Sequence, residues 1–153
     1  MPTDEELVKC RQDAMRLLKF RARSSKELKE RLETKGHSSE VVDTVLEYCR
    51  KHRFLDDKLF ALVWARSRAK KPFGYNRIRR ELLAKGISQE FIDEVFREIK
   101  QEYHEEEAIE GIVKARLLKY KGLEPRKIKA RLFGFLLRRG FSQDRVMEVV
   151  SRI

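Results

Sequence analysis

The chain has 153 residues, of which 41% are hydrophobic and 40% charged, and its formal net charge is +11. This length suits one ordinary domain or a few small repeats that share a core. The longest apolar runs are only a few residues, which excludes a membrane span, and the excess of positive charge favours a polyanionic partner, nucleic acid first.

Two cysteines, Cys10 and Cys49, are too few for a disulfide scaffold or a metal motif. Both fall at apolar positions of helical patterns, so we expect reduced thiols in the core. The first residues, MPTDEELVKCRQ, lack the apolar core of a signal peptide. A cytoplasmic protein is therefore expected.

Apolar residues at helical spacing predict three longer helices, at about residues 4–20, 56–70 and 104–119. Asp56 or Asp57 can cap the second of them. Each is followed by a middle helix that ends at a glycine, the residue that best accepts a left-handed conformation after a helix. These glycines are Gly36, Gly86 and Gly140. A serine then caps a third helix. These serines are Ser38, Ser88 and Ser142.

The middle helices belong to three copies of one unit. Leu32, Leu82 and Leu132 are 50 residues apart, whereas Gly140 lies 54 residues after Gly86, so four residues are added within the third middle helix. Pro125 suits its first turn. No stretch alternates like a strand. We predict an all-α fold of three tandem three-helix repeats (residues 1–53, 54–102 and 103–153) that form a short curved solenoid.

The middle helices carry charge of different sign. Arg77 and Arg80 are expected to project away from the apolar side, with Arg79 at its flank. The corresponding positions are Glu27 and Glu30 in the first repeat, and Lys127 and Ala130 in the third. A surface that only keeps a protein soluble has no reason to sort its charges in this way. Repeats two and three are therefore predicted to bind a polyanion.

The residues predicted to bind DNA are the cations of this basic face: Arg66, Arg68, Lys70, Lys71, Arg77, Arg79, Arg80, Lys127, Lys129, Arg131, Arg138 and Arg139. Phe54, Phe73 and Tyr75 could stack on bases. They could equally fill gaps between repeats, and the sequence leaves both interpretations open.

Two other classes of protein fit less well. The segment AKGISQEF has the rhythm of a helix-turn-helix, but the following helix carries Glu90, Asp93 and Glu94, which would meet phosphates on entering a groove. The three histidines are scattered, and no catalytic set, phosphate loop, metal-ligand cluster or cofactor motif appears. No enzymatic activity, metal or cofactor is expected.

The segment FLDDKLFALVWARSRAKKPFGYNRIRRELLAKGIS, residues 54–88, resembles the signature of RecX, the bacterial regulatory protein of the RecA recombinase. The matching elements include Phe54-Leu55-Asp56-Asp57, Arg77-Ile78, Glu81-Leu82 and Lys85-Gly86-Ile87. The resemblance covers nearly the whole chain, because the family is likewise built from three tandem three-helix repeats. Pro72 and Tyr75 depart from the commoner pattern, which has glycine and proline there.

The resemblance implies a function. RecX-like proteins bind the RecA filament on single-stranded DNA, lie along its groove, and inhibit or moderate ATP hydrolysis, strand exchange and co-protease activity. The expected partners are thus the RecA filament and single-stranded DNA, with double-stranded DNA as a further candidate and no membrane. The chain is expected to act as a monomer. The alternative is a stand-alone DNA-binding protein without sequence specificity.

Overall fold

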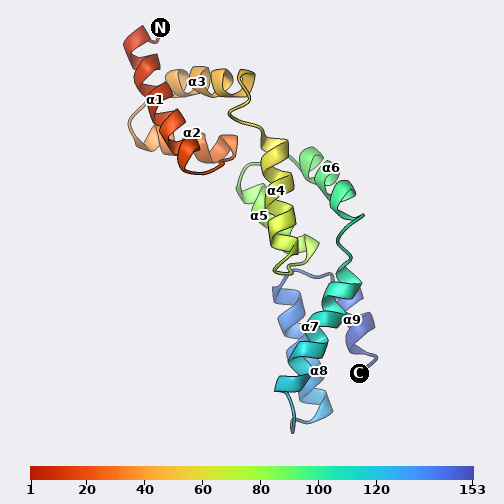
Figure 1. Ribbon diagram of the computed structural model, residues 1–153. Helices are drawn as coiled ribbons and strands as arrows, with labels where there is room; N and C mark the ends of the chain where they lie inside the picture. The colour runs from red at the N-terminus through yellow and green to blue at the C-terminus, as the bar shows by residue number, and fades with distance from the viewer. The chain divides into compact units, whose positions relative to one another are not determined.

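The computed structural model describes residues 1–153 and contains nine α-helices and no β-strand (Figure 1). Their bounds are α1 (Asp4–Phe20), α2 (Ser25–Thr34), α3 (Ser39–Lys51), α4 (Asp57–Ala69), α5 (Tyr75–Ala84), α6 (Gln89–Ile99), α7 (Glu105–Lys119), α8 (Pro125–Arg138) and α9 (Gln143–Val150). The predicted all-α fold is confirmed, and the three longer helices begin and end within one residue of the predicted ranges. None of the helices is long and apolar enough to cross a bilayer.

Capping side chains set where the helices begin. Asp56 accepts a hydrogen bond from the Leu59 amide at 3.0 Å, so of the two aspartates considered it is Asp56 that caps α4. The predicted serine caps of α3, α6 and α9 each accept a hydrogen bond from the amide three residues later. Such a cap satisfies one of the amide groups that a helix start leaves without a partner.

Left-handed glycines end the middle helices, as predicted. Gly36, Gly86 and Gly140 have φ angles of 100°, 79° and 97°. Each lies two residues beyond the last residue of α2, α5 or α8. The four extra residues between Gly86 and Gly140 therefore correspond to an added turn in α8, which has 14 residues where α2 and α5 have 10.

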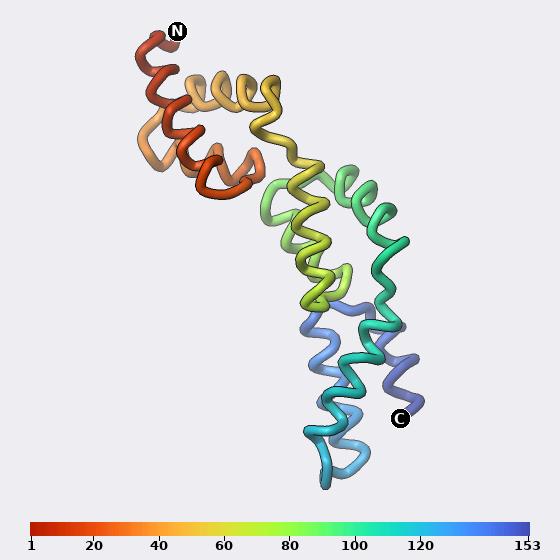
Figure 2. Tube along the Cα trace, viewed as in Figure 1, coloured from red at the N-terminus to blue at the C-terminus, as the bar shows by residue number.

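The chain forms two compact units. Unit one comprises residues 1–63 and 82–92, and unit two comprises residues 64–81 and 93–153. The core of unit one includes both cysteines, which are free thiols with no exposed surface, as predicted. The core of unit two lies among α7, α8 and α9, and Figure 2 shows the backbone descending through α7 and returning along α8. The repeat boundaries at residues 53/54 and 102/103 stay a prediction from the sequence.

Within unit one, the start of α2 is held by residues of the second repeat. The Ser25 amide donates to the Asp57 carboxylate at 2.8 Å. Lys26 donates to the Ala84 carbonyl at 3.2 Å, and the Lys85 ammonium lies 3.2 Å from the Glu27 carboxylate. We call this set of contacts the first joint.

Within unit two, the start of α5 is held in the same way by the third repeat. The Tyr75 amide donates to the Glu105 carboxylate at 2.6 Å. The Gly74 amide donates to the Arg139 carbonyl at 2.9 Å, and the Asn76 amide to the Gly140 carbonyl at 3.0 Å. We call this set the second joint. In both joints, the first residue of a middle helix is bound by the acid that begins the next repeat's first helix.

The third middle helix begins differently. Pro125, the first residue of α8, occupies the position of Ser25 and Tyr75, and proline has no amide hydrogen to donate. Lys127, two residues later, is exposed, whereas Glu27 and Arg77 at the same position are partly buried. This end of α8 is exposed.

Candidate nucleic-acid interface

Three of the arginines predicted to bind DNA surround one buried ring. Phe73 is only 8% exposed. The guanidinium carbon of Arg77 lies 3.8 Å from the centre of this ring, and those of Arg68 and Arg139 lie 4.4 Å from it. Such cation–π contacts contribute roughly 0.5–2 kcal/mol each. Phe73 is therefore a packing residue, the second of its two interpretations, and the three arginines take part in the fold.

The Glu81 carboxylate balances part of this charge. Arg68 binds it through two hydrogen bonds of 2.7 and 2.6 Å, Trp64 donates to it at 3.2 Å, and Arg77 lies 3.5 Å away. Burial alone would raise the pKa of Glu81, but the hydrogen bonds and positive charge of Arg68, helped by Trp64 and Arg77, lower it overall. The carboxylate is thus held in its charged form.

Arg139 is bound to backbone rather than to a carboxylate. Its guanidinium donates to the Pro72 carbonyl at 3.0 and 2.9 Å and to the Lys71 carbonyl at 2.7 Å. Burial and the neighbouring Arg77 charge lower its pKa. Arg139 therefore fixes the loop before α5 to the end of α8.

The predicted outward position of Arg77 is wrong. Its side chain is 35% exposed, and a Cβ on Gly140 would meet its backbone nitrogen at 2.6 Å, so the next repeat covers it. Glu27, also expected to face outward, is 17% exposed for the same reason. Arg80 and Glu30 are exposed, as predicted.

The remaining predicted cations differ in how free they are. Arg66 is paired with Glu102 at 2.8 Å, both being about half exposed. Arg79 is half-buried beside the Phe96 ring, and its Nε has no hydrogen-bond partner. Lys129 is half-buried on α8. The exposed cations without an ion pair are Lys70, Lys71, Arg80, Lys127, Arg131 and Arg138.

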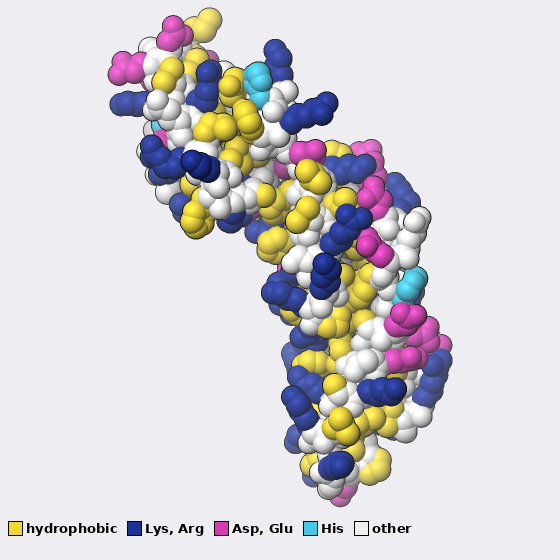
Figure 3. All heavy atoms as spheres, in the orientation of Figure 1, with side chains coloured by type: hydrophobic (Ala, Val, Ile, Leu, Met, Phe, Trp, Pro, Cys, Tyr) yellow, Lys and Arg dark blue, Asp and Glu magenta, His cyan; other side chains and the backbone are white.

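Three exposed cations of α8 form one stripe. Lys127, Arg131 and Arg138 recur at intervals of four and seven residues, which places them on the same side of a helix over about 16 Å of its length. Gly134 lies in the same stripe, and the Arg138 guanidinium occupies part of the space where its side chain would be. Lys and Arg side chains line the edge of the lower part of Figure 3, where α8 runs. This stripe, which we call the α8 stripe, faces solvent and presents no carboxylate.

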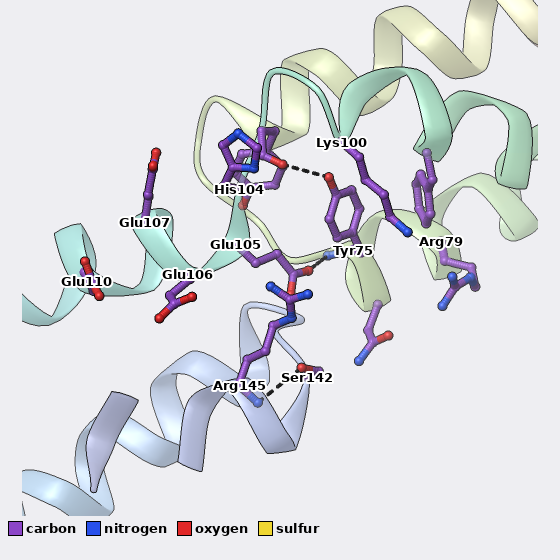
Figure 4. Close-up of a pocket in the computed structure, with 13 residues that line it drawn as sticks. Tyr75, Arg79, Lys100, His104, Glu105, Glu106, Glu107, Glu110, Ser142 and Arg145 are labelled. Atoms are coloured by element: carbon purple, nitrogen blue, oxygen red, sulfur yellow. Dashed lines mark hydrogen bonds and ion pairs between the residues drawn. The ribbon is translucent and has the colours of Figure 1, made fainter. Parts of the chain in front are cut away.

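A polar cavity of about 830 Å³ lies in unit two beside the second joint (Figure 4). Glu105 reaches from the start of α7 toward the Tyr75 amide, and Arg145 of α9 lies 3.8 Å from its carboxylate. The Tyr75 hydroxyl donates to the Tyr103 carbonyl at 2.9 Å. Tyr75 is thus a packing residue. The labelled acids Glu106, Glu107 and Glu110 line the same cavity, so it mixes both signs of charge.

Glu105, the first residue of α7, is a buried carboxylate that the sequence analysis did not single out. It is 4% exposed. Burial raises its pKa, although the Tyr75 amide and the Arg145 charge act in the opposite direction. Burial and the nearby Glu105 raise the pKa of Tyr75 to about 12. The available signal was positional, because Glu105 begins the first helix of its repeat, as Asp57 begins the first helix of the previous one.

Comparison with known proteins identifies the family. Models for the first, second and third three-helix domains of RecX match residues 10–49, 56–95 and 104–150. The chain belongs to the RecX family. The tandem three-helix organisation predicted from the repeat interval is thereby confirmed.

Relatives named Regulatory protein RecX match over most of the chain. The protein of Clostridium botulinum (strain Alaska E43 / Type E3) is 29% identical over 148 residues, covering 96% of this chain and 69% of its own length. That of Haemophilus influenzae (strain PittGG) is 30% identical over 137 residues, covering 89% of each. This chain is thus similar to regulatory proteins of the RecX family.

Two solved RecX structures share the fold. A crystal structure of regulatory protein RecX superposes with a TM-score of 0.85 at 21% identity, covering 97% of this chain and 74% of the other. The RecX structure from Lactobacillus salivarius gives the same score at 18% identity, covering 98% and 97%. At these identities the likeness supports the RecX fold alone. No cluster of His, Cys, Asp or Glu in this RecX-family chain is arranged to hold a metal.

Proposed function

We propose that this protein regulates the RecA recombinase by binding the RecA filament assembled on single-stranded DNA. Membership of the RecX family, whose members are named regulatory proteins, carries the proposal. The action we propose is inhibition of ATP hydrolysis, strand exchange and co-protease activity. The protein acts as a monomer in the cytoplasm, where RecA filaments form, and needs no cofactor or catalytic residue of its own.

The charge distribution supports DNA contact within this function. The α8 stripe offers cations without carboxylate partners at an exposed surface. Lys70, Lys71 and Arg80 add three more in the second repeat. Phosphate contacts of this kind supply sequence-independent affinity, which suits a filament that forms on any sequence. Arg68, Arg77 and Arg139 support the fold instead of serving as free contacts.

The alternative is a stand-alone DNA-binding protein, and three titrations at one salt concentration separate the two. The partners are bare single-stranded DNA, free RecA, and the nucleotide-bound filament. Contacts with protein and DNA together raise the effective concentration of each, so the filament should bind at least about tenfold more tightly. RecA ATPase activity should fall in the same titration. Equal affinity for bare DNA and filament, with an unchanged ATPase rate, would support the alternative.

The α8 stripe can be tested separately. Lys127→Glu should weaken DNA and filament binding and flatten the log–log salt slope by about 0.7 to 0.9 for the lost phosphate contact. Lys9→Glu, an equally exposed lysine of α1 with no ion pair, makes the same charge change elsewhere. If the two variants lose affinity equally, net charge and not the stripe is responsible.

A further inference from the structure

A second surface with the features of a nucleic-acid site lies in unit one. It belongs to the first repeat, although the middle helix of that repeat carries acidic residues. A shallow cavity of about 690 Å³ opens beside α1 and the link between α3 and α4. Its lining consists of three cations and three apolar residues: Arg16, Lys19, Arg53, Met15, Leu18 and Phe54. None of them is acidic, and of the three cations only Arg16 is paired with a carboxylate, that of Asp13 at 3.7 Å, so the cavity attracts anions.

A cluster of three aromatic rings lies beside this cavity, and Phe54 is the member that lines it. Phe54 is 44% exposed, and its ring centre lies 6.2 Å from that of His52, with an angle of 25° between the planes. The Tyr48 ring centre lies 4.3 Å from that of His52 and 6.5 Å from that of Phe54, and the Arg11 guanidinium carbon lies 4.1 Å from the centre of the Tyr48 ring. Figure 3 shows hydrophobic side chains at the surface of the N-terminal part, with Lys, Arg and His side chains around them. Phe54 is therefore an aromatic ring that other rings adjoin and that is partly open to solvent.

The matching position in the next link is also exposed to solvent. Phe54 lies three residues before Asp57, as Glu102 lies three residues before Glu105. Glu102 is about half exposed and paired with Arg66. This position of the link therefore accepts a charged residue in one repeat and carries a partly exposed aromatic ring in the other.

The backbone also presents Arg53 and Phe54 together. Arg53 has a φ of 62° and is the one non-glycine residue in the left-handed region. Its amide donates to the Arg50 carbonyl, and the Phe54 amide donates to the Cys49 carbonyl at 2.8 Å. Left-handed geometry is unfavourable for an arginine, and these hydrogen bonds hold the turn in place. Arg53 and Lys19 have no carboxylate partner.

We propose that this surface is a second binding site for single-stranded nucleic acid, separate from the α8 stripe. A base stacks on the exposed part of the Phe54 ring, which the rings of His52 and Tyr48 adjoin. The phosphates on either side of that base lie against Arg53, Lys19 and Arg16. Aromatic rings that stack bases beside cations that follow the backbone are the usual elements of single-strand binding without sequence preference.

An acidic peptide is the other ligand that such charge could attract. The exposed Phe54 ring favours the nucleic acid, because a planar base can stack on it, whereas a peptide carboxylate would contact only the cations. The two ligands also differ in what they need from Phe54. A base needs the face of an aromatic ring, and an apolar peptide side chain needs only a hydrophobic surface.

Phe54→Leu separates these requirements, since leucine keeps the hydrophobic surface and removes the aromatic ring. In fluorescence anisotropy with labelled oligo-dT, without RecA, the full-length variant should bind at least about fivefold more weakly than the unmodified protein. Phe20→Leu is the matched control, because Phe20 is an 83% exposed aromatic residue of the same repeat outside the cavity. It should bind oligo-dT unchanged.

An abasic oligonucleotide of the same length provides the second comparison. The unmodified protein should bind it about as weakly as Phe54→Leu binds oligo-dT, and Phe54→Leu should bind both equally. Lys19→Gln, which leaves the aromatic rings intact, should flatten the salt slope by about 0.7, and Lys9→Gln should not.

Equal binding of oligo-dT by Phe54→Leu and the unmodified protein would overturn the inference. So would loss of binding to free RecA with oligo-dT binding intact, which would make the surface a protein contact. Should Phe54→Leu fail to fold, as circular dichroism would show, an unchanged salt slope in Lys19→Gln would overturn the inference in its place. Because these measurements omit RecA, their outcome is independent of the proposed regulatory function.

Discussion

The first and second joints perform the same task with different chemistry. In the first, Glu27 accepts hydrogen bonds from Lys85 and Arg21. In the second, the equivalent of Glu27 is Arg77 and the equivalent of Lys85 is Arg139, and two like charges cannot pair. The Phe73 ring lies against both guanidiniums instead, and Glu81 and backbone carbonyls balance them. The charge difference between the middle helices thus reports how each repeat attaches to the next.

Substitutions at the glycines that end the middle helices should show the difference between the joints most clearly. A Cβ on Gly140 would meet the Arg77 backbone nitrogen at 2.6 Å, one on Gly86 would meet the Lys26 Cβ at 2.6 Å, and one on Gly36 would meet nothing within 4 Å. We expect alanine to cost about 1 kcal/mol at Gly36, about 2 at Gly86 and about 3 or more at Gly140. Urea unfolding measures all three. Equal losses would mean that the joints do not restrict these positions.

The carboxylate of Glu81, which balances the arginines around Phe73, should matter more than an exposed one. Glu81→Gln removes the negative charge that Arg68 and Arg77 face, in a place where the side chains of Glu81 and Arg68 are about one-fifth exposed. We expect a loss of about 2 kcal/mol in the free energy of unfolding. Glu102→Gln, which breaks the half-exposed pair with Arg66, should lose less than about 0.5 kcal/mol. Similar losses for the two variants would argue against a structural role for Glu81.

The two joints should respond to pH with opposite sign. Burial would raise the pKa of Glu27, but hydrogen bonds from Arg21, the Ser24 amide and Lys85 lower it from 4.5 to about 2. Its contribution is therefore fully present above about pH 4.5 and is lost as the pH falls toward 2. The pKa of Glu105 is raised by burial, so the folded state holds this proton longer and stability falls as the pH rises above 4.5.

Unfolding free energies across this pH range test the difference. Glu27→Gln should remove about 1 to 2 kcal/mol of the rise in stability between pH 2 and 4.5. Glu105→Gln should remove the decline in unfolding free energy that Glu105 causes above pH 4.5. Slopes of the same sign for both residues would contradict the contrast between the joints.

The smallest expected effect on stability concerns one position of the middle helix, which is covered in the second repeat and exposed in the third. Arg77→Ala removes the contact with Phe73 and should cost about 1 kcal/mol of stability. Lys127→Ala changes the same position where no repeat covers it, and should leave the thermal midpoint unchanged. Differential scanning calorimetry of both would decide this. A loss at Lys127 would show that this end of α8 is packed after all.

Sequence reasoning predicted the features that depend on contacts within a single repeat. The helices, the serine caps, the left-handed glycines and the buried cysteines depend on neighbours within the same repeat, and helical periodicity registers them. Helical periodicity could not place Arg77 or Glu27. It distinguishes residues that face the core of their own repeat from residues that do not, and it cannot tell which of the latter are covered by the next repeat. Glu105 was missed for the same reason, since a run of acids at a helix start usually lies in solvent.

Pro125 also bears on how many repeats of this kind can be stacked. Ser25 and Tyr75 each donate an amide hydrogen to the acid of the following repeat, and Pro125 has none to give. A repeat appended to the third by gene duplication or by design would lose that bond and leave its own first acid without this partner. Lengthening the array would be easier by inserting a copy of the second repeat, whose Tyr75 amide is already suited to the acid that follows.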